Sequence, residues 1–145
     1  MTVAQRGGRV GATATLLDVR LLAVTGRSHL APTSADELEV RVDQAAGIQR
    51  VDDRRLVVLA TTDVAVHAVS DGNPLVWECR LELALAYEVA GLAERTDDEL
   101  QAFAVTSGAL AANPFFREHV RDLAGRSGLP PILLPMVRLD LEILD

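Results

Sequence analysis

The side chains best suited to metal binding or nucleophilic catalysis are three histidines and one cysteine in a chain of 145 residues. His29, His67 and His119 fall in separate segments without metal-ligand spacing, so they are interpreted as structural or surface residues. Cys79 could be a nucleophile if His67 reached it across a hairpin, but its alternation with Trp77 and other apolar residues favours a small core residue. The sequence therefore predicts no enzymatic activity, no metal and no cofactor.

The composition narrows the choice of partners. A formal net charge of -7 argues against nucleic acid and against anionic membrane surfaces, because both attract a cationic face. A single cysteine cannot form an intramolecular disulfide and suits a reducing compartment. The first residues have no apolar secretory core, and no stretch reaches the length of a membrane span. We therefore expect a cytoplasmic protein without membrane insertion.

Alternating polar and apolar residues predict strands that are buried on one face. The predicted strands span residues 13–24, 38–43, 55–69 and 75–89. Residues 45–51 are interpreted as a connection with Gly47 at its turn. We expect residues 1–12 to be a disordered N-terminal segment, followed by one domain over residues 13–145.

The last predicted strand gives the clearest signal, since every second residue from 75 to 89 is apolar. The sequence D-G-N-P at residues 71–74 predicts the turn of a hairpin with the preceding strand, because Gly and Asn tolerate positive φ. In the first strand, the same alternation places Leu17, Val19 and Leu21 on one face.

A change of period after residue 95 indicates a helix. Thr96 and Glu99 have the spacing of a capping box, and apolar residues follow at helical intervals. Pro114 removes a helix hydrogen bond, so we expect the helix to kink or restart there and to end near Gly125 or Gly128. The predicted fold is α+β, with a four-stranded antiparallel sheet followed by a long kinked helix. One helix cannot cover both faces of such a sheet, which predicts self-association.

An uncharged apolar segment follows the predicted helix, reading G-L-P-P-I-L-L-P-M-V over residues 128–137. A protein normally buries such a segment or uses it for binding. The pattern alone leaves both possibilities open: the segment covers the sheet, or it lines a groove. For Trp77, a place in the core is favoured over a place in a groove.

Several residues around this segment carry a family resemblance. They are Pro114, Arg117, Glu118, Val120, Leu129, Pro130, Ile132, Leu134 and Val137. In this order they resemble the helix end and crossover loop of the SecB export chaperones, and the resemblance extends over residues 13–140. It implies a homotetramer, built as a dimer of dimers, that acts as an ATP-independent holdase for unfolded polypeptides. The residues that it implies for the client-binding groove are Leu129, Pro130, Ile132, Leu134, Met136, Phe116 and Trp77.

Departures from the export members point to a branch of the family. Export members offer acidic residues to the motor ATPase SecA, and Glu78 and Glu82 are the weak candidates here. Arg20 and Arg80 stand where more acidity is expected. The motifs L-L-D-V-R-L-L and T-D-D-E-L-Q-A-F-A-V-T-S-G resemble the SecB-like chaperones of toxin–antitoxin systems, which protect an aggregation-prone antitoxin. A general holdase is the first hypothesis, with either SecA or an antitoxin as its partner.

Two hypotheses from other classes make different predictions. A small α+β ligand-binding or enzymatic domain would enclose a pocket between sheet and helix, with polar side chains converging in it. A purely structural oligomer subunit would bury its spare apolar surface against copies of itself and bind no client.

Overall fold

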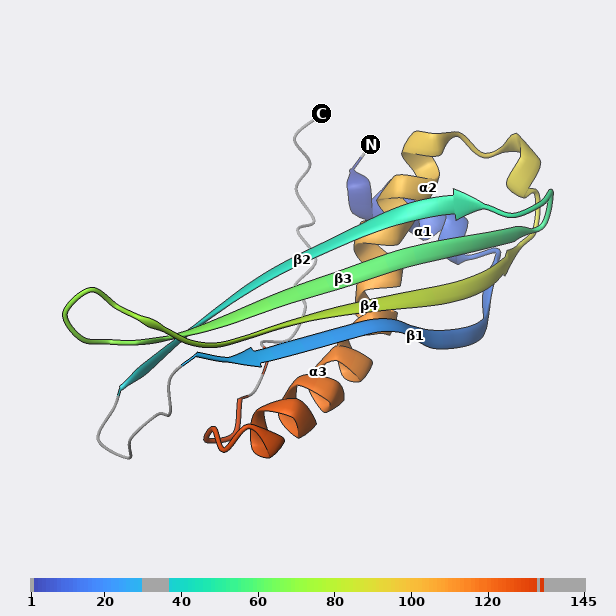
Figure 1. Cartoon of the computed structure of the whole chain (residues 1–145). Helices are drawn as coiled ribbons and strands as arrows, with labels where there is room; N and C mark the ends of the chain where they lie inside the picture. The colour runs from blue at the N-terminus through green and yellow to red at the C-terminus, as the bar shows by residue number, and fades with distance from the viewer. Residues whose placement is uncertain (1, 30–36, 133, 135–145) are drawn as a thin grey trace.

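The structure is a computed structural model that describes residues 2–29, 37–132 and 134. A four-stranded antiparallel sheet forms one layer, in the order β1-β4-β3-β2, and the helices lie on one of its faces (Figure 1). The strands are β1 (Ala14–Ser28), β2 (Leu38–Arg50), β3 (Arg55–Ala68) and β4 (Leu75–Val89). The helical elements are α1 (Val3–Gly11), η1 (Leu92–Glu94), α2 (Asp97–Phe103), η2 (Ala104–Gly108) and α3 (Ala109–Arg126). The predicted α+β order is confirmed.

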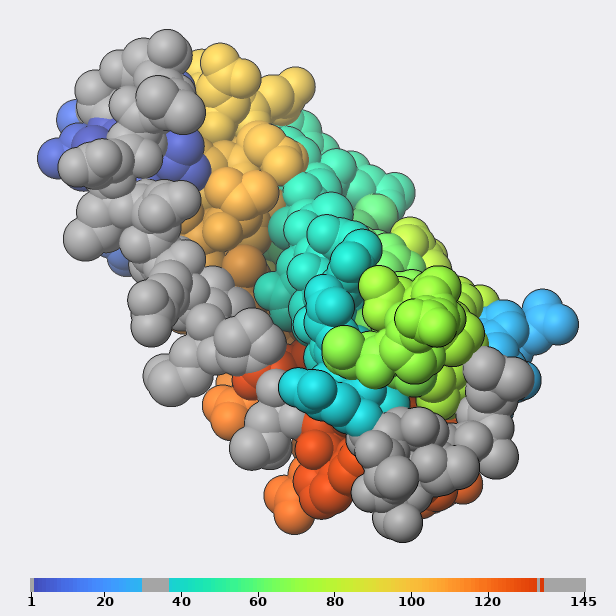
Figure 2. All heavy atoms as spheres, turned by 90° about the vertical axis from the view of Figure 1, so that its left-hand side faces the viewer, coloured from blue at the N-terminus to red at the C-terminus, as the bar shows by residue number. Residues whose placement is uncertain are grey.

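The central strands β3 and β4 carry the core. Every second side chain of β4 from Trp77 to Val89 is buried, as the alternation predicts, and the strand has the predicted bounds. The turn between β3 and β4 has positive φ at Gly72 (80°) and Asn73 (39°), so the predicted hairpin is confirmed. Figure 2, turned toward the tip of this hairpin, shows α1 beside α2 at one end of the molecule and α3 at the other.

Strand β1 departs from simple alternation. Its pairing with β4 shifts register between Leu16 and Asp18 and again between Leu21 and Ala23, so Leu17 and Leu22 are the extra residues of two β-bulges. The predicted grouping of Leu17 with the residues two and four positions later is therefore wrong. A bulge inserts one residue and reverses the face of everything after it, which a period-two pattern cannot reveal.

Strand β2 runs without a break through the segment that the sequence assigns to a connection. Ala45, Gly47 and Gln49 pair with residues of β3, so the predicted turn at Gly47 is wrong. Ile48 packs on the core from this extension. Pairing along the whole of β3 outweighs the weak strand propensity of a single glycine.

The N-terminal segment is helical, so the prediction of disorder there is wrong. Thr2 Oγ1 accepts a hydrogen bond from the Gln5 backbone N–H, and the Gln5 side chain accepts one from the Thr2 backbone N–H. This is a capping box, and T-x-x-Q was visible in the sequence. Val10 is fully buried against the core. Gly7 approaches α2 and η2 so closely that a Cβ there would overlap Thr106 Oγ1.

The helical layer runs from Thr96 to Arg126. Thr96 Oγ1 accepts a hydrogen bond from the Glu99 backbone N–H at 3.2 Å, which confirms the predicted cap. The intervening η2 is a π-helical turn, and its Gly108 lies where a Cβ would be 3.0 Å from Val58 Cγ1 of the sheet. Pro114 lies inside α3, so the helix does not stop there. Figure 1 shows the axis changing direction between α2 and α3, as expected of a long kinked helix.

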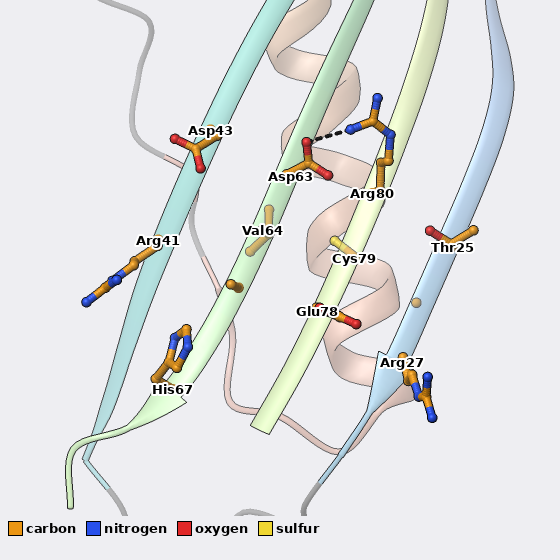
Figure 3. A pocket seen from close by; sticks show the side chains of 12 residues that line it. Thr25, Arg27, Arg41, Asp43, Asp63, Val64, His67, Glu78, Cys79 and Arg80 are labelled. Carbon is orange, nitrogen blue, oxygen red and sulfur yellow. Dashed lines mark hydrogen bonds and ion pairs between the residues drawn. The ribbon is translucent and has the colours of Figure 1, made fainter. Parts of the chain in front are cut away.

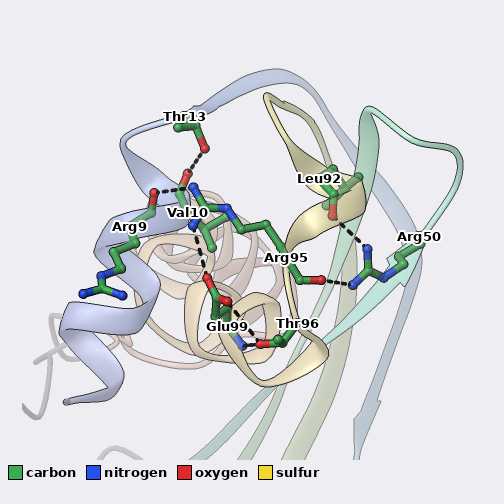
Figure 4. A network of polar contacts seen from close by, with 8 residues as sticks. All are labelled: Arg9, Val10, Thr13, Arg50, Leu92, Arg95, Thr96 and Glu99. Carbon is green, nitrogen blue, oxygen red and sulfur yellow. Dashed lines mark hydrogen bonds and ion pairs between the residues drawn. The ribbon is translucent and has the colours of Figure 1, made fainter.

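Two arginines link the sheet to the helices through hydrogen bonds (Figure 4). Arg50, at the end of β2, donates to the carbonyl oxygens of Leu92 at 3.0 Å and Arg95 at 2.6 Å. Its guanidinium also donates to the Asp97 carboxylate at 3.0 Å. Arg95 in turn donates to the Arg9 carbonyl of α1 at 3.4 Å. The edge strand, the start of α2 and the end of α1 are thereby linked.

Candidate functional site

The end of the sheet near the β3–β4 hairpin carries Trp77 on its helix side. Its indole is 1% exposed, and its Nε1–H donates to Ser127 Oγ at 3.0 Å. Ser127 Oγ donates to the Leu123 carbonyl at 2.9 Å, so the C-terminal end of α3 is fixed over the indole. Trp77 is thus a core residue at this position, with its one polar atom satisfied.

The chain leaves α3 by a glycine turn and covers this end of the sheet with a strip (residues 127–132 and 134). Gly128 has φ +74°, and the Leu129 N–H donates to the Ala124 carbonyl at 3.0 Å, which is the helix-ending pattern predicted for Gly128. Leu129, Ile132 and Leu134 are 7%, 5% and 2% exposed.

Five of the seven side chains predicted for a groove lie in one buried apolar cluster. These five are Trp77, Phe116, Leu129, Ile132 and Leu134. Pro130 is exposed on the outside of the strip, and Met136 lies outside the described residues. The structure therefore buries these five side chains in the core, and their binding role stays a prediction. The sequence shows which positions of such a segment are apolar. It does not show whether each side chain faces the core or a groove.

Exposed apolar surface lies elsewhere, mainly on the edge strand β1. Five of its large side chains are 42–54% exposed: Leu16, Leu17, Leu21, Leu22 and Val24. Further exposed apolar side chains lie on the helices: Val105, Leu110 and Phe115. The sequence predicts spare apolar surface, but its location depends on the bulges of β1 and on the turn of the helix after η2.

The opposite face of the sheet is open and polar. A shallow hollow of about 640 Å³ crosses all four strands there (Figure 3). Arg80 donates to Asp63 at 2.7 Å and to Glu82 at 3.3 Å, and these hydrogen bonds raise the pKa of Arg80 above its usual range. Glu78 lies 3.2 Å from His29 Nε2. Both carboxylates predicted for a SecA contact are on this face, each beside a basic side chain.

The alternative enzymatic interpretation gains little from the described residues. Burial, and secondarily the charge of Asp63, raise the pKa of the Cys79 thiol to about 12, so it is protonated at neutral pH. No group of three metal-ligating side chains could hold a metal ion among the described residues. In the same part of the chain, no helix is both long and apolar enough to cross a membrane.

A long antiparallel sheet covered on one face by a bent helical layer, with spare apolar side chains on its edge strand, is the architecture of a SecB-like chaperone. The solved Mycobacterium tuberculosis Rv1957 SecB-like chaperone, in complex with a ChAD peptide from the Rv1956 HigA1 antitoxin, matches with a TM-score of 0.83 and 28% identity. The match covers 94% of this chain and 99% of that one.

Sequence comparison gives the same result. The SecB-like chaperones MT2006 and Rv1957, from two strains of Mycobacterium tuberculosis, are each 31% identical over 147 aligned positions. Each alignment covers 90% of this chain and 81% of the relative. No protein-family model matches the chain. The chain belongs to the SecB-like chaperones, which confirms the resemblance stated from the sequence.

Proposed function

We propose that this chaperone is an ATP-independent holdase whose dedicated client is an antitoxin, which it keeps in a soluble, extended state. The observation that carries the proposal is the solved relative, which holds a ChAD peptide of an antitoxin and aligns with 94% of this chain. An extended client exposes apolar side chains and unpaired backbone groups. Both are satisfied by an apolar surface beside a sheet, without a requirement for one sequence.

The second candidate partner, SecA, is less well supported, and with it a role in protein export and translocation. A basic partner needs unpaired carboxylates, whereas Glu82 shares Arg80 with Asp63 and Glu78 contacts His29. Arg80 therefore offsets part of the negative charge that this face would offer to a cationic tail. The solved relative, with its antitoxin peptide, is the stronger support for the antitoxin-dedicated form of the chaperone.

A homotetramer is part of the proposal. The exposed leucines of β1 lie along an edge strand whose outer backbone groups are unpaired within the sheet, and such an edge is stabilised by a second strand. The apolar side chains on the outer surface of the helices provide a second patch, so two kinds of contact are available, as a dimer of dimers requires.

For the client-binding site we propose the end of the molecule at which Trp77, Phe116 and the strip come together, with Met136 as a further contact. An extended segment that runs along this end meets the exposed Pro130 and reaches the buried aliphatic and aromatic side chains where the strip makes room for it. Burial stabilises such contacts by about 25 cal/mol per Å² of apolar surface, whatever the client sequence.

Two experiments test these statements separately. A chemically denatured model client should stay in solution when an equal amount of the protein, without nucleotide, is present during dilution. Unchanged light scattering would refute the holdase. For the site, a photo-crosslinking benzoylphenylalanine replaces Pro130, and the matched control replaces Asp53, an exposed residue in the β2–β3 turn. Cross-linking of the client from position 130 and not from position 53 is expected, and the reverse pattern would move the site elsewhere.

A further inference from the structure

The strip is packed as an apolar client segment would be. Leu129, Ile132 and Leu134 are buried, while Pro130 and Pro131 between them are exposed. Among the described residues of the strip, the large aliphatic side chains are therefore buried and the two prolines face outward. In the same region, Trp77 provides a broad aromatic surface whose only polar atom bonds to the first residue of the strip.

The backbone of the strip is weakly attached. The Leu129 N–H bonds to the end of α3. Beyond it, residues 130–132 and 134 make no backbone–backbone hydrogen bond to another described residue, and two of them are prolines without an N–H. Apolar burial is non-directional, so another extended segment with similar side chains satisfies the same surface. Segments with few backbone hydrogen bonds are also the ones that open locally at low free energy.

The chain turns sharply where the strip follows α3. Gly128 adopts a left-handed φ of +74°, with no atom within 4 Å of where a Cβ would stand. Just before it, Ser127 bonds to both the Trp77 indole and the Leu123 carbonyl. Among the described residues, one hydrogen bond to the sheet and three buried aliphatic side chains hold the strip closed.

We propose that the strip is an internal occupant of the client site. An extended client segment with two or three large aliphatic or aromatic side chains binds over Trp77 and its apolar surroundings by displacing Leu129, Ile132 and Leu134. This inference rests on the proposed holdase function and adds that the site is occupied by the chain itself when no client is present. The apparent affinity for a client is then the intrinsic affinity multiplied by the open fraction.

The hydrogen bond between Trp77 and Ser127 gives a test, because the proposal predicts the direction in which its loss changes the affinity for a client. In the proposed open state the client lies over Trp77 and the strip has left it from Ser127 onward, so the indole N–H bonds to water or to the client, and Ser127→Ala removes this bond from the closed state only. The variant should therefore bind an unfolded client roughly two- to tenfold more tightly than the wild type, the effect of one hydrogen bond on the open fraction. The matched control is Ser70→Ala, at an exposed serine of the β3–β4 turn, and should leave affinity unchanged.

Trp77 supplies a second readout, because it is the single tryptophan of the chain. The probe is reduced and carboxamidomethylated pancreatic trypsin inhibitor, an unfolded polypeptide without tryptophan, titrated while the emission of Trp77 and the anisotropy of a dye on the client are recorded. Displacement of the strip predicts that the emission spectrum of Trp77 shifts with the same midpoint as binding. Tighter binding by Ser127→Ala together with this shift supports the proposal.

Other outcomes overturn it in distinguishable ways. Client binding by the wild type with an unchanged Trp77 spectrum, or weaker binding by Ser127→Ala, would show that the strip is a fixed wall while the holdase function stands. Absence of client binding by the wild type would refute the proposed function itself. Circular dichroism of both serine variants checks that their folds match the wild type.

Discussion

Replacing Gly7 by alanine tests how α1 is held on the helical layer. A Cβ at Gly7 would overlap Thr106 Oγ1 and lie 2.9 Å from the Ala102 carbonyl oxygen. A Cβ at Gly8, one residue later on the same helix, would meet no atom within 4 Å. Gly8→Ala is therefore a matched control that has the same change in helix propensity without the overlap.

The two substitutions should shift stability in opposite directions. Overpacking of this kind costs about 1–3 kcal/mol. If the overlap costs more than docking contributes, α1 leaves the surface instead. The loss is then limited to the burial of Val10, which contributes about 1.5–3 kcal/mol. Gly8→Ala should instead stabilise the protein by roughly 0.5–1 kcal/mol, because alanine loses less conformational freedom in a helix. Because the gain in helix propensity is common to both variants, their free energies of unfolding should differ by the cost of the overlap alone, about 1–3 kcal/mol.

Urea unfolding at one fixed protein concentration measures this difference, and native-state hydrogen exchange locates it. The nine residues of α1 form too short a helix to be stable alone, so the Gly7→Ala variant should lose exchange protection in α1 before the sheet does. Adding Thr106→Ala removes the overlapping hydroxyl and should recover part of the loss. Equal urea midpoints for the Gly7 and Gly8 variants would refute the close-packed docking of α1.

Two further predictions concern polar contacts. Arg50→Lys should lower the free energy of unfolding, measured by urea unfolding, by about 1–3 kcal/mol. A single ammonium cannot replace a guanidinium that donates to two carbonyl oxygens and a carboxylate. Arg54→Lys, at an exposed side chain, is the control. An unchanged midpoint for Arg50→Lys would contradict the linking role. Because burial raises the pKa of Cys79 to about 12, the unfolded thiol ionises first, and wild-type stability relative to Cys79→Ala should fall as pH rises from about 9 toward 12. A difference that does not change with pH would show that Cys79 is accessible to water.

The strands could be predicted where a single physical pattern decides them. β4 alternates through fifteen residues and is paired on both sides, so its bounds follow from its sequence. β1 alternates as well, but the extra residues Leu17 and Leu22 depend on its register against β4. The glycine of β2 resembles a turn residue, yet Gly47 pairs with Leu59 across the ladder. Local signals thus fail where a neighbouring strand determines the conformation.

The same distinction explains the outcome for the site. Trp77 was better predicted as a core residue than as a groove residue, and its burial agrees. The apolar character of the strip could be read from its sequence, whereas its burial depends on where Gly128 turns the chain after α3. Helix α1 had a visible capping signal at Thr2, but its stability comes from close contact with a helix about 100 residues later, which no local pattern contains.

The most direct measurement of the central claim uses an antitoxin as client. The probe is HigA1, the antitoxin whose ChAD peptide the solved relative binds. It is diluted from denaturant with equimolar protein and no nucleotide, and soluble antitoxin is quantified after centrifugation, alone and with an excess of the ChAD peptide as competitor. We expect the antitoxin to stay soluble with the protein and to precipitate when the peptide occupies the site. An antitoxin that precipitates equally with and without the protein would contradict an antitoxin-holding chaperone.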